Sequence, residues 1–138
     1  MAVLNLQTIR YINLLDETAR VKTSKCFTYN NTIIFAVRGD LLSKAIGQQG
    51  MNIKRLQDRL GKRVRMIQEA KSLEDAGKFV RDIVSPVYFR SIEARDNEII
   101  ITAGGIQSKA ALIGRDKKRL EELSQILEDT FGMKLRVV

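Results

Sequence analysis

Apolar residues near the start of the chain recur at the spacing of a helix. Steps of three or four residues separate Ile9, Ile12, Leu15 and Ala19, while charged residues fall between them. Positions three and four apart share one face of an α-helix, so a surface helix shows an apolar stripe of this kind. The pattern predicts an amphipathic helix with these four side chains directed toward the core.

The pattern then changes to two β-prone runs, at residues 25–29 and 32–38. Asn30-Asn31 separates the runs, and asparagine is favoured in tight turns because it tolerates positive φ angles. We therefore expect a β-hairpin or two neighbouring strands.

A short helix, a four-residue turn, a longer helix and a strand complete the first half. Asp40 follows the strand and is a suitable N-cap for the short helix. Gly61 is placed to end the longer helix. The expected elements are the short helix to Ile46, the turn at 47–50, the helix at 51–60 and an edge strand at 62–67.

Residues 70–138 repeat this order. The run 72–75 (Ser-Leu-Glu-Asp) is typical of a capping box that starts a helix ending before Ser85-Pro86. Strands at about 87–94 and 98–103, a short helix, a long helix and a final strand follow. The sequence predicts an α+β fold in two domains, 1–69 and 70–138. Each has the order α-β-β-α-α-β and a three-stranded sheet packed against helices.

Aromatic residues lie in the expected strands. For Phe27, Tyr29 and Phe35, core packing is favoured over base stacking. Tyr88 and Phe89 are adjacent, and side chains alternate across a strand, so one of the two is expected to face water.

The two halves share a motif between their paired helices. The first copy reads Ile46-Gly47-Gln48-Gln49-Gly50, and the second reads Ile113-Gly114-Arg115-Asp116-Lys117. The second copy keeps the frame but has lysine at the position of the second glycine. The chain is therefore a duplication with one intact Gly-x-x-Gly turn and one altered turn.

A glycine turn before a helix suits a sugar-phosphate backbone. A helix start presents unpaired N–H groups and partial positive charge to anions, and glycine lets a strand approach the main chain closely. Lys44, Lys54 and Arg55 flank the turn and are candidates to neutralise phosphates. We expect an aspartate at Gly47 or Gly50 to abolish such binding and leave the fold intact.

Charge is divided unevenly between the halves of this chain of net charge +8. Residues 1–69 hold 12 Lys and Arg against 5 Asp and Glu, a net +7, whereas residues 70–138 hold 12 against 11, a net +1. A polyanion would be attracted mainly to the first half.

Composition argues against several classes of site. One cysteine, Cys26, and no histidine leave no internal disulfide and no plausible zinc cluster, so Cys26 is expected to be a small buried hydrophobe in a strand. Neither turn fits the phosphate-binding motif of NTPases, and the available carboxylates have adequate structural roles. No apolar run is long enough to span a bilayer. We expect a cytoplasmic protein that is not an enzyme and uses no metal or cofactor.

These motifs resemble a tandem pair of prokaryotic-type (type II) KH domains over nearly the whole chain. Residues 45–50, 52–56 and 61–64 resemble most the KH pair of the NusA family of transcription elongation and termination factors, particularly its short archaeal form. The resemblance implies binding of single-stranded RNA, the nascent transcript, in elongation, termination or antitermination. Together with the flanking cations it gives these expected RNA-binding residues: Lys44, Ile46, Gly47, Gln48, Gln49, Gly50, Asn52, Lys54 and Arg55 in the first domain, and Lys109, Gly114, Arg115, Asp116, Lys117 and Lys118 in the second.

The second turn departs from the family pattern. Lys117 adds a side chain where close approach is expected, and Asp116 places negative charge beside a phosphate path, so this turn is expected to bind weakly or differently. One alternative is a ribosome-associated or ribosome-assembly KH protein that binds ribosomal RNA. In another, the near-neutral second domain docks a protein. RNA polymerase is a candidate second partner, and we expect a monomer.

Overall fold

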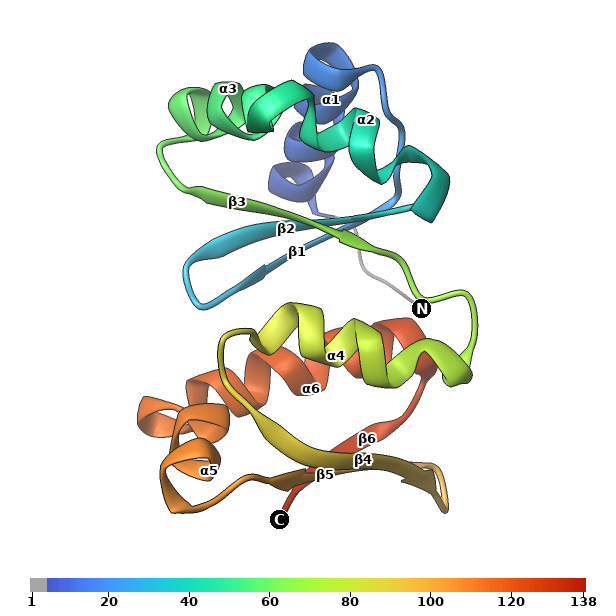
Figure 1. The fold of residues 1–138 in the computed structure, drawn as a ribbon, viewed down its shortest axis with the longest axis vertical. Helices are drawn as coiled ribbons and strands as arrows, with labels where there is room; N and C mark the ends of the chain where they lie inside the picture. The colour runs from blue at the N-terminus through green and yellow to red at the C-terminus, as the bar shows by residue number, and fades with distance from the viewer. Residues whose placement is uncertain (1–4) are drawn as a thin grey trace. The chain divides into compact units, whose positions relative to one another are not determined.

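The computed structural model describes residues 5–138, which form two compact units, residues 5–69 and 70–138 (Figure 1). Both are α+β, with a three-stranded sheet and helices against one of its faces. The elements of the first unit are α1 (Leu6–Ala19), β1 (Lys25–Tyr29), β2 (Thr32–Val37), α2 (Leu42–Ile46), α3 (Met51–Leu60) and β3 (Arg63–Gln68). The order α-β-β-α-α-β expected from the sequence is confirmed for this unit.

The sheet of the first unit is built on a tight hairpin. β1 pairs antiparallel with β2, and Asn30 and Asn31 connect them with φ angles of 52° and 58°. Two positive φ angles in a two-residue connection match the right-handed twist of the flanking strands. β3 then pairs parallel with β2, with Ile33 opposite Val64, and lies at the sheet edge as expected. The predicted hairpin is confirmed.

The core of the first unit lies between the sheet and its three helices. Leu15, Phe35, Ala45 and Leu56, from α1, β2, α2 and α3, are fully buried. Burial of such side chains is the main favourable term in folding.

The predicted inward face of α1 is partly wrong. Ile9 is 39% exposed and Ile12 is half-buried, whereas Tyr11 and Leu14 are buried beside Leu15. The helix is therefore rotated from the orientation that the apolar spacing suggested. Several rotations of one helix satisfy a three-to-four periodicity, and packing against α3 and β1 selects among them.

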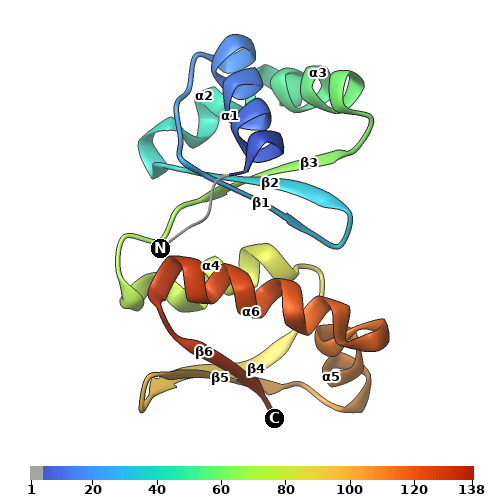
Figure 2. The same cartoon turned by 180° about the vertical axis from the view of Figure 1, so that it is seen from behind.

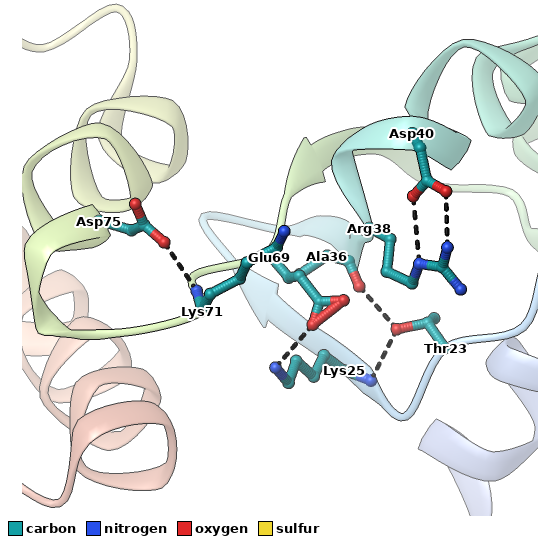
Figure 3. A network of polar contacts seen from close by, with 8 residues as sticks. All are labelled: Thr23, Lys25, Ala36, Arg38, Asp40, Glu69, Lys71 and Asp75. Atoms are coloured by element: carbon teal, nitrogen blue, oxygen red, sulfur yellow. Dashed lines mark hydrogen bonds and ion pairs between the residues drawn. The ribbon is translucent and has the colours of Figure 1, made fainter.

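Polar contacts tie the ends of the first sheet together (Figure 3). The Thr23 hydroxyl donates to the carbonyl of Ala36 at 2.6 Å, and Lys25 Nζ forms an ion pair with Glu69 at 2.9 Å. Asp40 is not the N-cap of α2: its carboxylate accepts two hydrogen bonds from Arg38, and a 3₁₀ turn at Gly39–Leu41 precedes the helix. The charged neighbour outcompetes the helix N–H groups for this carboxylate.

The second unit has the same order of elements (Figure 2). They are α4 (Ala76–Val84), β4 (Phe89–Arg95), β5 (Glu98–Ala103), α5 (Ile106–Ile113), α6 (Lys118–Phe131) and β6 (Lys134–Val137). β4 is antiparallel to β5 across Asp96-Asn97, and β6 is parallel to β5. α6 has 14 residues against 10 in α3, and both helices end at a glycine in the left-handed conformation.

The predicted capping box at 72–75 is wrong in its side-chain contacts. The Ser72 side chain caps nothing, and Asp75 accepts a hydrogen bond from the backbone N–H of Lys71. A 3₁₀ turn at Leu73–Asp75 leads into α4, which ends at Val84 as expected.

Candidate nucleic-acid interface

The intact turn joins α2 to α3 through a short backbone path with three positive φ angles. Gly47 has φ 81° and ψ 164°, Gln49 has φ 54°, and Gly50 has φ 72°. The N–H of Gly50 donates to the carbonyl of Gly47 at 3.1 Å, which closes the turn. The path carries the chain from the end of α2 to the start of α3 within four residues.

The two glycines of this turn have different roles. A Cβ at Gly47 would lie 2.9 Å from the backbone nitrogen of Asn52, and the φ/ψ of Gly47 belongs to a region that only glycine occupies readily. At Gly50 an added Cβ would meet nothing within 4 Å. The fold therefore requires glycine at 47, which contradicts the expectation that an aspartate there leaves the fold intact. Gly50 instead leaves open space beside the main chain.

The Asn52 side chain stabilises the turn through a hydrogen bond. Its side-chain Nδ2 donates to the carbonyl of Lys44 at 3.0 Å, which ties the start of α3 to α2. The sequence motif placed Asn52 among the expected RNA contacts and gave no direct indication of this structural role. The one signal in the sequence was the position of Asn52 just after the turn, where a polar side chain at the start of α3 can reach back to α2.

The rest of the turn presents an exposed, positively charged surface. Gln48 and Gln49 are exposed, Ile46 is half-buried, and no side chain caps the start of α3. Three cations surround the turn: Lys44, Lys54 and Arg55 are all exposed, and within residues 5–138 none of them forms an ion pair. An uncapped helix start with unneutralised cations is an environment that attracts an anion.

The altered turn follows almost the same backbone path. Gly114 has φ 76° and ψ 173°, Asp116 has φ 55°, and Lys117 has φ 61° and ψ 20°. A Cβ at Gly114 would lie 2.9 Å from the Cβ of Arg119, so glycine is required here too. Arg119 occupies the position of Asn52 and pairs instead with Glu122 at 2.8 Å.

The remaining predicted residues of the second unit surround this turn. Lys109, Arg115, Asp116, Lys117 and Lys118 are exposed, and none forms an ion pair with another residue of the described chain. Each unit thus gathers its own candidates around its own turn. Lys117 places a side chain where the first unit has open space.

The structure also bears on the other kinds of site considered. Within residues 5–138 no three His, Cys, Asp or Glu side chains gather as a metal site, and no helix is both long and apolar enough to cross a bilayer. Cys26 lies on β1 as expected, half-buried against the core. Burial raises the pKa of its thiol to about 12, so the thiol stays protonated at neutral pH.

Comparison with known proteins identifies similar chains. No protein-family model matches this one. A Halococcus morrhuae protein named "Probable transcription termination protein NusA" is 23% identical over 127 residues, which cover 91% of this chain and 89% of that protein. Proteins of the same name from Methanocaldococcus jannaschii and Methanococcus vannielii are 27% and 23% identical and cover 91% and 95% of this chain, or 68% and 76% of their own length. The chain resembles archaeal NusA over most of its length.

A solved structure supports the same arrangement of elements. The crystal structure of APE1850 matches 98% of this chain and all of its own, with a TM-score of 0.67 and 26% sequence identity. The similarity therefore spans both units. The names of the NusA relatives associate this chain with transcription regulation and termination.

Proposed function

We propose that this protein is a single-stranded RNA-binding factor of the NusA type, built from two tandem type II KH domains at residues 1–69 and 70–138. It acts in transcription elongation, termination or antitermination by gripping the nascent transcript. The relatives' names favour a nascent transcript over ribosomal RNA. The repeated order α-β-β-α-α-β, with a glycine turn between the paired helices of each unit, supports the KH assignment.

The observation that carries the proposal is the open main chain at Gly50. A Cβ added at Gly50 would meet nothing within 4 Å apart from its own residue and its neighbours in the chain, and the helix that follows has no side-chain cap. A phosphate can approach these backbone groups closely, while Lys44, Lys54 and Arg55 supply the opposing charge. Gln48 and Gln49 are exposed beside the path and can donate further hydrogen bonds to the strand.

The second turn has a lesser part in this proposal. Lys117 carries a side chain at the position where Gly50 has none, and Asp116 repels phosphate. Arg115, Lys118 and Lys109 still offer exposed cations. The second unit therefore contacts RNA through side chains more than through its backbone, with lower affinity than the first unit.

A matched pair of variants tests the grip. Gly50→Asp and Gly50→Asn add side chains of nearly equal size, and both residues tolerate the left-handed conformation that Gly50 adopts. Fluorescence anisotropy with a short unstructured RNA should show several-fold weaker binding for Gly50→Asn. Gly50→Asp should bind at least about tenfold more weakly again, because it adds like charge. Wild-type affinity in Gly50→Asp would refute the assigned grip.

The source of the RNA needs a separate experiment. Crosslinking in cells followed by sequencing of the attached RNA should recover nascent transcripts. Recovery of ribosomal RNA in their place would refute the transcriptional role, even if the turn at 47–50 does bind RNA.

A further inference from the structure

Tyr88 is an exposed aromatic side chain outside the two turns. Its exposed fraction is 66%, whereas those of Tyr11 and Tyr29 are 7% and 6%, and its neighbour Phe89 is buried. The expectation that one of residues 88 and 89 faces water is therefore confirmed. Core packing therefore does not account for a tyrosine at position 88.

The ring of Tyr88 lies directly against a glycine. A Cβ at Gly104 would be 2.5 Å from ring atom Cδ2 and 2.9 Å from Cε2. The φ angle of Gly104 is not in the left-handed region, so its backbone does not itself demand glycine. The missing side chain lets the ring rest on the connection between β5 and α5 while most of the ring stays in solvent.

An arginine without a carboxylate partner shares a cleft with this ring. Tyr88 lines a shallow cleft of about 280 Å³ with Arg81 and Pro86, and the Arg81 guanidinium lies 5.6 Å from the centre of the Phe89 ring. Asp82 also lines the cleft, but Lys78 forms an ion pair with it at 2.9 Å. Within residues 5–138, Arg81 forms no ion pair.

A β-bulge adds a second guanidinium. Phe89 pairs with Ala103 and Ser91 pairs with Thr102, so Arg90 is the extra residue of β4. Bulges re-aim side chains at the edges of sheets, and Arg90 is exposed without an ion pair in the described chain. The open aromatic ring of Tyr88 therefore shares its cleft with Arg81, and Arg90 follows two residues later in the chain.

Tyr88 and the altered turn lie at opposite ends of α5 in the second unit. Gly104, under the ring, precedes α5, and Gly114, at the turn, follows it. The eight residues of α5 span about 12 Å at the usual rise per residue. A single strand that leaves the altered turn along α5 reaches Tyr88 within a few nucleotides.

We propose that Tyr88 is a stacking platform for a nucleobase of single-stranded RNA, with Arg81 and Arg90 contacting the adjacent phosphates. The inference rests on the proposed function and deepens it, because it gives the near-neutral second unit its own RNA contact. Unstacked bases of single-stranded RNA stack on aromatic side chains, and arginine contacts the neighbouring backbone. The shallow cleft and Arg81, which forms no ion pair in the described chain, favour this partner over an apolar protein segment.

Tyrosine fluorescence tests the stacking directly, because the chain has no tryptophan and its other two tyrosines are buried. Short unstructured RNA should quench the exposed emission of the full chain. Tyr88→Phe should remove that quenching and keep wild-type affinity by anisotropy, whereas Tyr88→Leu should lower affinity about tenfold. Equal affinities of the Phe and Leu variants would overturn the proposal.

Two further variants separate stacking from a general apolar contact. Gly104→Ala displaces the ring without removing it and should lower affinity about threefold, with an unchanged melting temperature. Ile106→Ser changes the 90% exposed isoleucine nearby and should leave RNA affinity unchanged. A loss in Ile106→Ser equal to that in Tyr88→Leu would mean that any exposed apolar side chain serves, and would overturn the stacking role.

The outcomes also distinguish this proposal from the proposed function. Binding that is lost in Gly50→Asp but unchanged in Tyr88→Leu overturns the stacking platform alone. A wild-type chain that binds no RNA overturns both.

Discussion

The turns at 47–50 and 114–117 share one backbone conformation, although three of their four residues differ. Their first residues have φ/ψ of 81°/164° and 76°/173°, and their last have 72°/21° and 61°/20°. The last residue is Gly50 in one turn and Lys117 in the other. Lysine thus adopts the conformation that glycine adopts in the first unit, so the turn does not need glycine at that place.

The comparison distinguishes glycines that the fold requires from a glycine that is available for RNA binding. Gly47 and Gly114 are required, because a Cβ at either would collide with the start of the next helix. Gly50 is not required for folding, and its bare main chain is therefore available for close approach. Net charge also differs between the two units: it is +7 in residues 1–69 and +1 in residues 70–138.

The largest expected effect is on stability, at the first glycine of each turn. Gly47→Ala and Gly114→Ala should each lower the free energy of unfolding by about 2–4 kcal/mol, because each adds a close contact to a glycine-only conformation. Gly50→Ala is the control and should lose only about 1 kcal/mol. Urea unfolding measures all three. A loss at Gly50 as large as at Gly47 would remove the distinction between required and available glycines.

The next effect is on the salt dependence of RNA binding. Replacing Lys44, Lys54 and Arg55 together by glutamine should reduce the slope of log affinity against log salt concentration by about 2, since each phosphate contact to a single strand contributes about 0.7. Affinity at low salt should fall by about tenfold or more. Lys109→Gln, which changes an exposed cation of the second unit, should have a smaller effect. If this single change matched the triple variant, the first unit would not be the main contact.

A smaller effect is expected at Lys117. Lys117→Gly removes the strain of a non-glycine residue at positive φ, although it also increases the entropy of the unfolded chain. The net expected result is a gain of about 0.5–1 kcal/mol in the free energy of unfolding, measured with urea. A loss of stability would mean that the lysine side chain makes contacts that outweigh its backbone strain.

Much of the fold follows from local sequence signals. Asn30-Asn31 and Asp96-Asn97 mark hairpins because their residues accept the positive φ angles that such connections need. Gly61 and Gly132 mark helix ends for the same reason. These signals depend on the residue itself, so they can be read without knowledge of its neighbours in space.

Other features depend on neighbours that only folding brings together. Asp40 is a suitable N-cap by type, but Arg38 takes its carboxylate. Gly47 and Gly50 look alike in the sequence, and only the position of Asn52 shows which one is required. The contact of the Tyr88 ring with Gly104 likewise joins residues that lie far apart in the sequence.

The central claim is that open backbone at Gly50, more than charge alone, holds the RNA. Gly50→Lys tests it most directly, because Lys117 shows that lysine fits this conformation and because the change adds positive charge. Anisotropy with short unstructured RNA at near-physiological salt should show affinity reduced about three- to fivefold despite the added charge. Affinity equal to or greater than that of the wild type would contradict the account, because charge alone would then explain the binding.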